Sequence, residues 1–320
     1  MAKHVGVKVA FALGTLFFVL TFNFFLFRVA GDPIKDLLRN PKITPEAREE
    51  LIRERGLDKD LFTQFRIYVG NTLTGELETS YATNRPVASE LADAIPNTII
   101  LVGSATVLSA LLGSWLGIVA ASRRGKPLDT TVTQGSLVLY SMPEFWLGMT
   151  LIWVFAVVLG AFPTGLKTDP GQEFSGLGYV WNVTQHAALP VLTLALGLLG
   201  QYVVIMRSAL ADVLNEDFVT TARAIGLPRW RVLRHHAVRN ALLPVVTLIS
   251  LNLGFVVSGA ITIEALFSWP GIGQLTVNAI DTKDLPMLQG IFLLSSAAVI
   301  LANLAADILL TYLDPRVRVS

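Results

Sequence analysis

Six apolar runs, each long enough to cross a lipid bilayer as a helix, constrain the fold of this chain more than any other feature. The first run has 19 residues without a charge. As an α-helix it is about 28 Å long and nearly spans a hydrocarbon core of about 30 Å. It is too long for a signal-peptide core, and no small-residue cleavage site follows it. We therefore predict an all-α polytopic membrane protein with six transmembrane helices. The runs cover residues 9–27, 94–122, 130–160, 186–206, 240–263 and 285–306.

The charges of the connecting segments predict how these helices are oriented. Segments 122–126, 207–239 and 314–318 are basic, whereas segments 161–184 and 267–286 carry one lysine each. Short basic loops stay on the cytoplasmic side of a membrane. The alternation therefore places both termini in the cytoplasm.

The only sizeable polar segment outside these runs and loops covers residues 31–95. It holds nine basic and twelve acidic residues, but long loops cross a membrane largely regardless of their charge. Thr44-Pro45 is typical of a helix start and Arg55-Gly56 of a helix end. The apolar spacing of residues 61–73 predicts a second, amphipathic helix. We expect a mostly helical segment outside the cell membrane.

The composition excludes several functional classes. The chain is 52% hydrophobic and 15% charged, whereas an average soluble domain is about one quarter charged. A net charge of +1 gives no indication of nucleic-acid binding. The lack of cysteine excludes disulfides, thiolate metal sites and a cysteine nucleophile, and the four histidines are too scattered for a metal cluster. The sequence shows neither a Walker phosphate-binding loop nor a catalytic constellation, so we expect a chain that is not an enzyme.

The basic segment 207–239 is the longest polar stretch among the later apolar runs, and it contains six arginines. Apolar residues from Leu210 to Ile225 recur at steps of three and four, which predicts one helix. Gly226-Leu227-Pro228 then predicts a break, and a second helix is expected from Arg229. Such a helix pair can present a rigid knob to a cytoplasmic partner. Alternatively, the arginines only fix the topology of the chain.

Glu144 is the most notable charge inside an apolar run. It follows Pro143 and lies fourteen residues after the start of the third run, about 21 Å deep in a helix. Intramembrane charges often mark a transport path. Glu144 either faces such a path and contacts a substrate amine, or pairs within the helix bundle. Glu264 and Asp307 lie near the ends of their runs and are expected to be structural.

Two stretches of the basic segment, 216–227 (EDFVTTARAIGL) and 236–244 (HAVRNALLP), closely resemble the signature cytoplasmic loop of ABC-importer permease subunits. The version that fits best is that of the dipeptide/oligopeptide transport family, first permease type. Further motifs of that family follow in the right order along the chain. They are GDP at 31–33, RPV at 85–87, PEFWLG at 143–148, FSWPGIG at 267–273 and LDPRVR at 313–318.

The loop departs from the general importer pattern in two places. Thr220-Thr221-Ala222 stands where Glu-Ala-Ala is usual, and Val238-Arg239 aligns with a Leu-Pro pair that this chain carries later, at Leu243-Pro244. Both departures resemble the peptide branch of the family. The first removes a salt bridge from position 220 to an ATPase, but not the coupling itself.

The resemblance implies an importer-type permease fold with four parts. These are an N-terminal transmembrane helix (1–30), an extracytoplasmic helical segment (31–95), a five-helix core (96–311) with its coupling loop (207–240), and a cytoplasmic tail (312–320). The extracytoplasmic segment is expected to help receive a substrate-binding protein, or to cap the bundle.

The resemblance also assigns roles to residues. The loop would dock as a coupling helix in a cleft of an ATPase subunit, with Gly226 setting the docking geometry because a Cβ opposes the left-handed conformation. The three arginines after the break would pair with ATPase carboxylates. The coupling residues are Asp217, Thr221, Ala222, Ala224, Gly226, Leu227, Arg229, Arg231 and Arg234. The translocation-pathway residues are Ser141, Pro143, Glu144, Phe145 and Trp146.

The partners that the resemblance implies are a second homologous permease, two ABC ATPase subunits that bind ATP and magnesium, an extracytoplasmic substrate-binding protein and the lipid bilayer. The chain itself is expected to hold no cofactor and to lie in the inner (cell) membrane of a bacterium or archaeon. The expected cargo is a di- or oligopeptide, with nickel chelates or oligosaccharides as alternatives on the same importer type. A self-contained channel or a membrane-embedded enzyme is the alternative from another class.

Overall fold

The computed structural model describes residues 2–30, 44–54, 58–256 and 260–313. These residues form helices joined by turns, and one isolated β-bridge pairs Thr79 with Pro86. The chain divides into two compact units, Met1–Pro96 with Gly271–Ser320, and Asn97–Pro270. The predicted motifs at 31–33 and 314–318, and most of the predicted tail, lie outside the described residues. The predicted four-part division stays a prediction.

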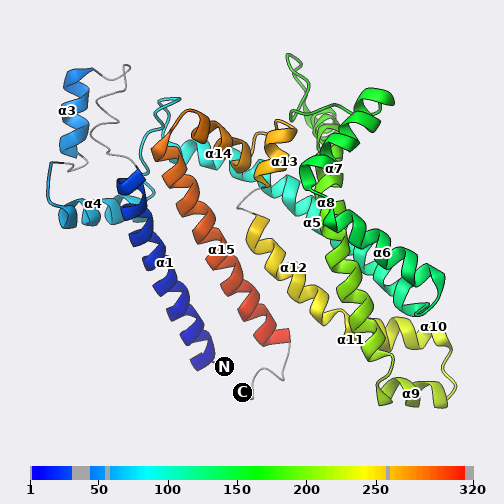
Figure 1. The fold of residues 1–320 in the computed structure, drawn as a ribbon. Coiled ribbons are helices and arrows are strands. Elements are labelled where there is room, and N and C mark those ends of the chain that lie inside the picture. Colours follow the sequence, from blue (N-terminus) through cyan, green and yellow to red (C-terminus); the bar gives the residue numbers. More distant parts are fainter. Residues whose placement is uncertain (1, 31–43, 55–57, 257–259, 314–320) are drawn as a thin grey trace. The chain divides into compact units, whose positions relative to one another are not determined.

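The first unit pairs the two terminal helices of the chain. Helix α1 (Ala2–Ala30) lies beside α15 (Leu285–Leu313), as Figure 1 shows. The Lys8 ammonium lies 3.0 Å from the Asp307 carboxylate, and the Asn23 side-chain amide donates to the Gln289 carbonyl at 3.3 Å. Polar contacts near both ends of the pair therefore fix its register.

Two predicted helices of the polar segment are confirmed. Helix α3 (Pro45–Glu54) begins at the expected proline. Helix α4 (Leu61–Thr74) begins after Asp60, whose carboxylate accepts the Thr63 N–H at 3.1 Å, and ends at Gly75 in the left-handed conformation. These are an ordinary N-cap and C-cap, so local sequence determines both ends of α4.

The core of the first unit joins α15 to the start of α5 (Val87–Ser122) and to α14 (Ile272–Asp281). Buried Asp284 accepts the Ser80 hydroxyl at 2.5 Å and the Met287 N–H at 3.2 Å, so it caps α15 and holds the preceding loop. Hydrophobic side chains fill the remaining space. They are Val87, Leu91, Ala94, Ile272, Ala279, Met287 and Ile291.

The second unit is built around α8 (Gly176–Val213), a single helix of 38 residues. Glycines on it and on its neighbours allow the helices to approach closely. A Cβ on Gly113 or Gly117 of α5 would lie within 2.8 Å of α8, and a Cβ on Gly200 of α8 would lie 2.6 Å from Tyr140 of α6 (Pro127–Ser141). Small residues at such contacts drive helix association in lipid, where the hydrophobic effect between helices is absent.

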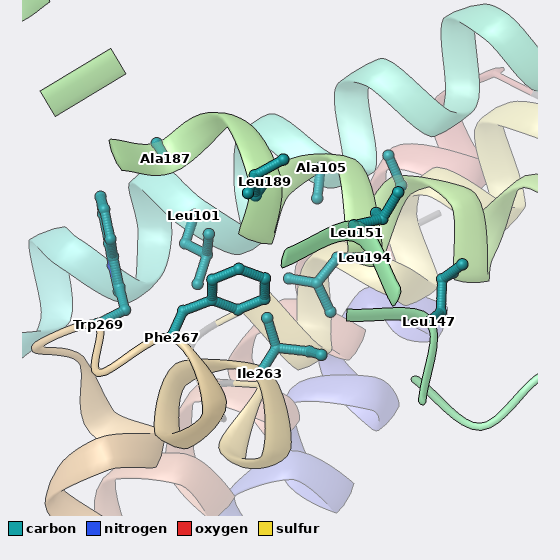
Figure 2. Close-up of a cluster of buried hydrophobic side chains, with 11 residues drawn as sticks. Leu101, Ala105, Leu147, Leu151, Ala187, Leu189, Leu194, Ile263, Phe267 and Trp269 are labelled. Carbon is teal, nitrogen blue, oxygen red and sulfur yellow. The ribbon is translucent and has the colours of Figure 1, made fainter. Parts of the chain in front are cut away.

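A core cluster of the second unit lies around the middle of α8 (Figure 2). Phe267 and Trp269 insert between α5, α7 (Glu144–Leu151) and α8, next to Ile263 of α13 (Ile261–Leu266). The Trp269 indole N–H donates to the Asn97 carbonyl at 3.0 Å. Buried Glu264 accepts the Thr98 hydroxyl at 2.9 Å, which agrees with the expected structural role of that carboxylate.

Four described helices are long and apolar enough to cross a membrane, namely α1, α5, α8 and α15, and they match the first, second, fourth and sixth predicted runs. The third run is divided. Helix α6 and the stretch Glu144–Val158, which contains α7 and the π-helix η1 (Ile152–Val158), meet at 101° across Met142-Pro143, and count as a fifth span only if taken together. In the fifth run, α12 (Leu243–Val256) has 14 residues before the description stops. An all-helical polytopic fold is therefore confirmed, but six complete spans are not.

Candidate functional site

The basic loop begins with a turn at the end of α8. The Asn215 and Glu216 N–H groups donate to the Asp212 and Val213 carbonyls, and α9 (Asp217–Ala224) starts immediately afterwards. The prediction of one continuous helix from Leu210 to Ile225 is therefore wrong. The Asn215 side chain donates to the Ala211 carbonyl at 3.0 Å, and such side-chain-to-backbone bonds favour turns over helix. The apolar spacing survives the turn, which is why periodicity did not reveal it.

Gly226 ends α9 as predicted, in the left-handed region with a φ of 82°. The Leu227 N–H donates to the Ala222 carbonyl at 3.2 Å, and the Ile225 N–H donates to Thr221 at 3.1 Å. The bond from Leu227 to Ala222 is the outer bond of a Schellman motif, which needs a residue that tolerates positive φ. The geometry of the break thus depends on the glycine itself.

A small hydrophobic core makes the loop a rigid object. Val219 and Ala222 of α9 are buried against Val232, which opens the π-helix η2 (Val232–Ala237), and Leu214 and Leu227 pack around them. The Arg231 and Val232 N–H groups both donate to the Pro228 carbonyl, so the second arm starts at α10 (Arg229–Arg231) as predicted. The two arms therefore hold each other independently of any partner.

The second arm also packs onto α8. Ala237 of η2 and Ala241 of α11 (Val238–Ala241) are fully buried against Met206 and Leu210. Because those two residues lie in the last two turns of α8, the loop is attached to this helix by side chains as well as by the backbone.

The outer surface of the loop carries most of the predicted coupling residues. Ala222 is buried and Leu227 half-buried, so both support the loop from within, and the Arg229 side chain lies outside the described part. The remaining predicted residues are exposed. They are Asp217, Thr221, Ala224, Gly226, Arg231 and Arg234.

Three large apolar side chains that sequence reasoning did not select are also exposed on the loop. Phe218 lies on α9, Ile225 follows the last residue of that helix, and Trp230 follows the break. The Trp230 ring is 5.9 Å from the Arg231 guanidinium and 6.3 Å from the His235 ring. Aromatic and arginine side chains are enriched at protein interfaces. The spacing of Phe218 and Ile225 was the available signal, but spacing predicts only a helix face and not whether that face is exposed.

An ion pair at the base of the loop was also missed. The Arg207 guanidinium near the end of α8 donates to both oxygens of the Asp129 carboxylate in α6, at 2.5 and 2.8 Å. Asp129 is buried and accepts the Gly125 N–H at 3.0 Å as well. Two parallel bonds fix orientation as well as distance. The pair joins the helix that carries the loop to the first half of the broken third run.

The predicted pathway residues lie at the break between α6 and α7. Pro143 is the N-cap of α7, and Glu144, Phe145 and Trp146 form its exposed first turn. The Ser141 hydroxyl donates a hydrogen bond to the Val138 carbonyl of the preceding turn at 2.9 Å. Among the described residues, no hydrogen bond or ion pair reaches the Glu144 carboxylate. Gly197 of α8 leaves space next to it, since a Cβ there would lie 3.7 Å from this carboxylate.

Comparison with known proteins gives consistent matches along the chain. A family model described as "Binding-protein-dependent transport system inner membrane component" matches residues 113–319. A di/tripeptide transport system permease protein of Pseudomonas aeruginosa is 36% identical, covering 99% of both chains. An oligopeptide transport system permease protein of Bacillus subtilis is 34% identical over 99% of both. A dipeptide transport system permease protein of Escherichia coli is 35% identical over 94% of this chain and 93% of its own.

The chain belongs to this family of transport-system inner membrane components. The matched stretch of the permease contains the whole basic loop and the break at Met142-Pro143. The resemblance read from the sequence motifs is thus confirmed. The permease is accordingly a multi-pass membrane protein of a transport system.

Proposed function

We propose that this permease forms half of the translocation pathway of an ATP-driven importer for di- and oligopeptides. The peptide cargo is inferred from relatives that match almost the full chain and whose names specify di/tripeptide, oligopeptide and dipeptide transport. The other half of the pathway would come from a second homologous permease. An extracytoplasmic binding protein would deliver the peptide to the side opposite the loop.

The observation that carries the coupling part of the proposal is the self-supporting basic loop. Its own core keeps α9 and the second arm together, while Phe218, Ile225, Trp230 and Arg231 remain exposed. Large exposed apolar side chains on a rigid knob are typical of a surface that a partner covers. Each of two ATPase subunits, which bind ATP and magnesium, would receive one such loop, and this chain would itself catalyse no reaction.

The mechanism follows from what the loop is attached to. When the ATPase subunits close on ATP, they would displace the docked loop, and with it α8, because Ala237 and Ala241 are buried against that helix. The bidentate pair between Arg207 and Asp129 would carry the same displacement to α6. The break at Met142-Pro143 gives α6 and α7 a point about which to change their angle. The proposed orientation, with both termini in the cytoplasm, puts the loop on the ATP side.

Glu144 is the proposed contact for cargo at this break. Its carboxylate has no partner among the described residues and sits at the turn where α6 gives way to α7. An unpaired charge at this depth in an apolar run is costly unless it faces water or a polar ligand. A peptide in transit offers an α-ammonium group, which a carboxylate binds through charge-assisted hydrogen bonds.

A mild-detergent purification through a C-terminal tag tests the assembly. Mass spectrometry of the retained proteins and released small molecules should find a second permease, two ATPase chains and short peptides. Recovery of this chain alone, or only with copies of itself, would contradict the importer and favour a self-contained channel. Release of a nickel chelate or an oligosaccharide instead of peptides would support the proposed importer but contradict the proposed peptide cargo.

A further inference from the structure

Helix α4 in the polar segment lies across α1, a membrane-spanning helix, near the C-terminal end of α1 (Figure 1). Aromatic rings make the contact. The Phe65 ring lies 5.3 Å from that of Phe24 and 6.5 Å from that of Phe17, and the Tyr68 ring lies 5.5 Å from Phe24. The Asn23 amide donates to the Tyr68 hydroxyl at 2.9 Å. The position of α4 along α1 is therefore fixed by several independent contacts.

This position places α4 within the thickness of the membrane rather than above it. The apolar span of α1 runs from Gly6 to Arg28, so Phe17 lies at its middle and Phe24 only about 6 Å from its end. Because the Phe65 ring reaches both phenylalanines, α4 crosses α1 between these two levels. A loop helix that only covered the end of the span would contact residues beyond Arg28 instead.

One side of α4, about a quarter turn from the side that contacts α1, is mainly apolar. Phe62 and Leu73 are each 76% exposed, and Val69 lies between them on the same face, at helical steps of seven and four residues. The polar residues Asn71 and Thr74 lie on the other side of the helix and are also exposed. Arg66, four residues after Phe62, lies on this side as well and is exposed; its long stem can lie along lipid while its charge reaches the headgroups.

The apolar face is continuous with a surface that must contact lipid. Phe65 touches Phe17, which is itself exposed on α1 near the middle of the span, and Phe18 next to it is exposed as well. An exposed phenylalanine row in a membrane span is covered by acyl chains or by another span. Phe62 lies one helical turn before Phe65 on α4, so the same cover can extend onto it.

We propose that α4 is an interfacial helix, lying in the plane of the membrane with Phe62, Val69 and Leu73 in contact with lipid acyl chains. Such helices combine an apolar face at the headgroup–acyl boundary with a polar face toward water. Its caps at Asp60 and Gly75 suit this arrangement because they satisfy backbone groups at the two ends of the helix. Part of the polar segment is thus a second membrane attachment for α1.

The lack of cysteine in the chain makes a sharp test possible. Single variants Phe62→Cys, Leu73→Cys and Asn71→Cys, with Phe18→Cys as a membrane-exposed reference, would carry a nitroxide spin label in the full chain reconstituted into phosphatidylcholine vesicles. Relaxation by oxygen, which concentrates in acyl chains, is compared with relaxation by a water-soluble nickel chelate. All four positions are exposed, so labelling should not disturb packing.

The proposal expects labels at positions 62 and 73 to favour oxygen over the nickel chelate, as at position 18, by at least fivefold relative to position 71. If positions 62 and 73 respond like position 71, the face lies in water and the proposal is overturned. If they are shielded from both reagents while position 71 is not, a protein covers the face, which overturns it as well. These outcomes do not depend on transport, so they separate this proposal from that of the importer.

Discussion

Gly226 determines how the two arms of the basic loop meet. Its φ of 82° is available to glycine at little cost, and a Cβ there would meet nothing within 4 Å. Steric clash with neighbours is therefore irrelevant, and only the backbone conformation opposes a side chain. Residue and conformation were both predictable from the Gly-Leu-Pro pattern, because the signal is local.

Gly226→Val should abolish uptake while the protein still inserts into the membrane. A β-branched residue disfavours the left-handed conformation by roughly 1–2 kcal/mol, so the loop shifts from its docking geometry. Gly75→Val is a matched control, since Gly75 has a φ of 79° and equally open surroundings but ends α4 instead. Uptake of a labelled dipeptide into vesicles measures both. Normal uptake by the Gly226→Val variant would contradict a role of this residue in docking.

Glu144→Gln should lower uptake of peptides with a free amino terminus by roughly 10- to 100-fold, since a hydrogen bond between charged groups contributes about 1.5–3 kcal/mol. ATP hydrolysis by the assembled transporter should change little. Glu144→Asp keeps the charge and should retain more uptake. Equal loss of uptake for N-acetylated and free peptides would contradict an ammonium contact.

The contrast between Gly226 and Asp129 shows which residue-level features a sequence can reveal. The glycine acts through its own backbone, whereas Asp129 acts through Arg207, 78 positions away. No local pattern connects those two side chains, because their distance depends on how α6 packs against α8. Likewise, the spacing of Phe218 and Ile225 predicts a helix face but not whether that face is buried.

At the level of whole elements, α8 is the part to which the others attach. Its apolar run was predicted over residues 186–206, but the helix extends from Gly176 to Val213. Hydropathy identifies only the part of a helix that must lie in lipid. The helix itself can extend into polar segments on both sides, which hydropathy does not report. The broken third run was predictable at Pro143, since proline removes a backbone donor. The angle of 101° between the two halves of that run could not be predicted from the sequence.

Gly200→Val should destabilise the contact between α8 and α6. The added Cβ would lie 2.6 Å from the Tyr140 Cβ and 2.8 Å from the Ser136 carbonyl oxygen, and overpacking of this kind costs about 1–3 kcal/mol. The apparent melting temperature in detergent should fall by several degrees. Gly135→Val on α6, where a Cβ meets nothing within 4 Å, serves as the control. Equal melting temperatures for the two variants would contradict the close approach of these two helices.

Removing one member of the ion pair should lower the stability of the protein more than exchanging the two residues with each other. Asp129→Asn leaves Arg207 without its charged partner, and Arg207→Gln leaves a buried carboxylate. Each should cost roughly 2–3 kcal/mol, below the usual cost in a fully buried pair because Arg207 reaches water. The exchange Asp129→Arg with Arg207→Asp should recover part of the stability and of the uptake. An exchange variant no better than either single variant would show that the pair has no such role.

For the molecule as a whole, the exposed loop surface is the part that the proposed ATPase subunits would cover. Membership of the transport family was readable from motifs spread over the chain, because each motif is local and their order is preserved. Which loop side chains are exposed was not readable, since that depends on the turn at the end of α8 and on the small core beneath α9.

Ile225→Asp should reduce the amount of ATPase subunits that co-purify with the permease by at least tenfold. Ile225 is 72% exposed, so the substitution leaves the loop core intact while it places a charge in the proposed interface. Leu177→Asp changes a similarly exposed residue at the other end of α8 and should leave co-purification unchanged. Quantitative mass spectrometry of the purified complexes measures the ratio. Unchanged recovery with Ile225→Asp would place the ATPase contact elsewhere.

The unbroken length of α8 has a mechanical consequence. A helix of 38 residues is about 57 Å long, nearly twice the hydrocarbon thickness. If it tilts by about 10° about its midpoint, its two ends move by about 5 Å in opposite directions, by the geometry of a rigid rod of that length. In the proposed importer, one such lever would close the membrane path at the loop end and widen it at the other end with a single rotation.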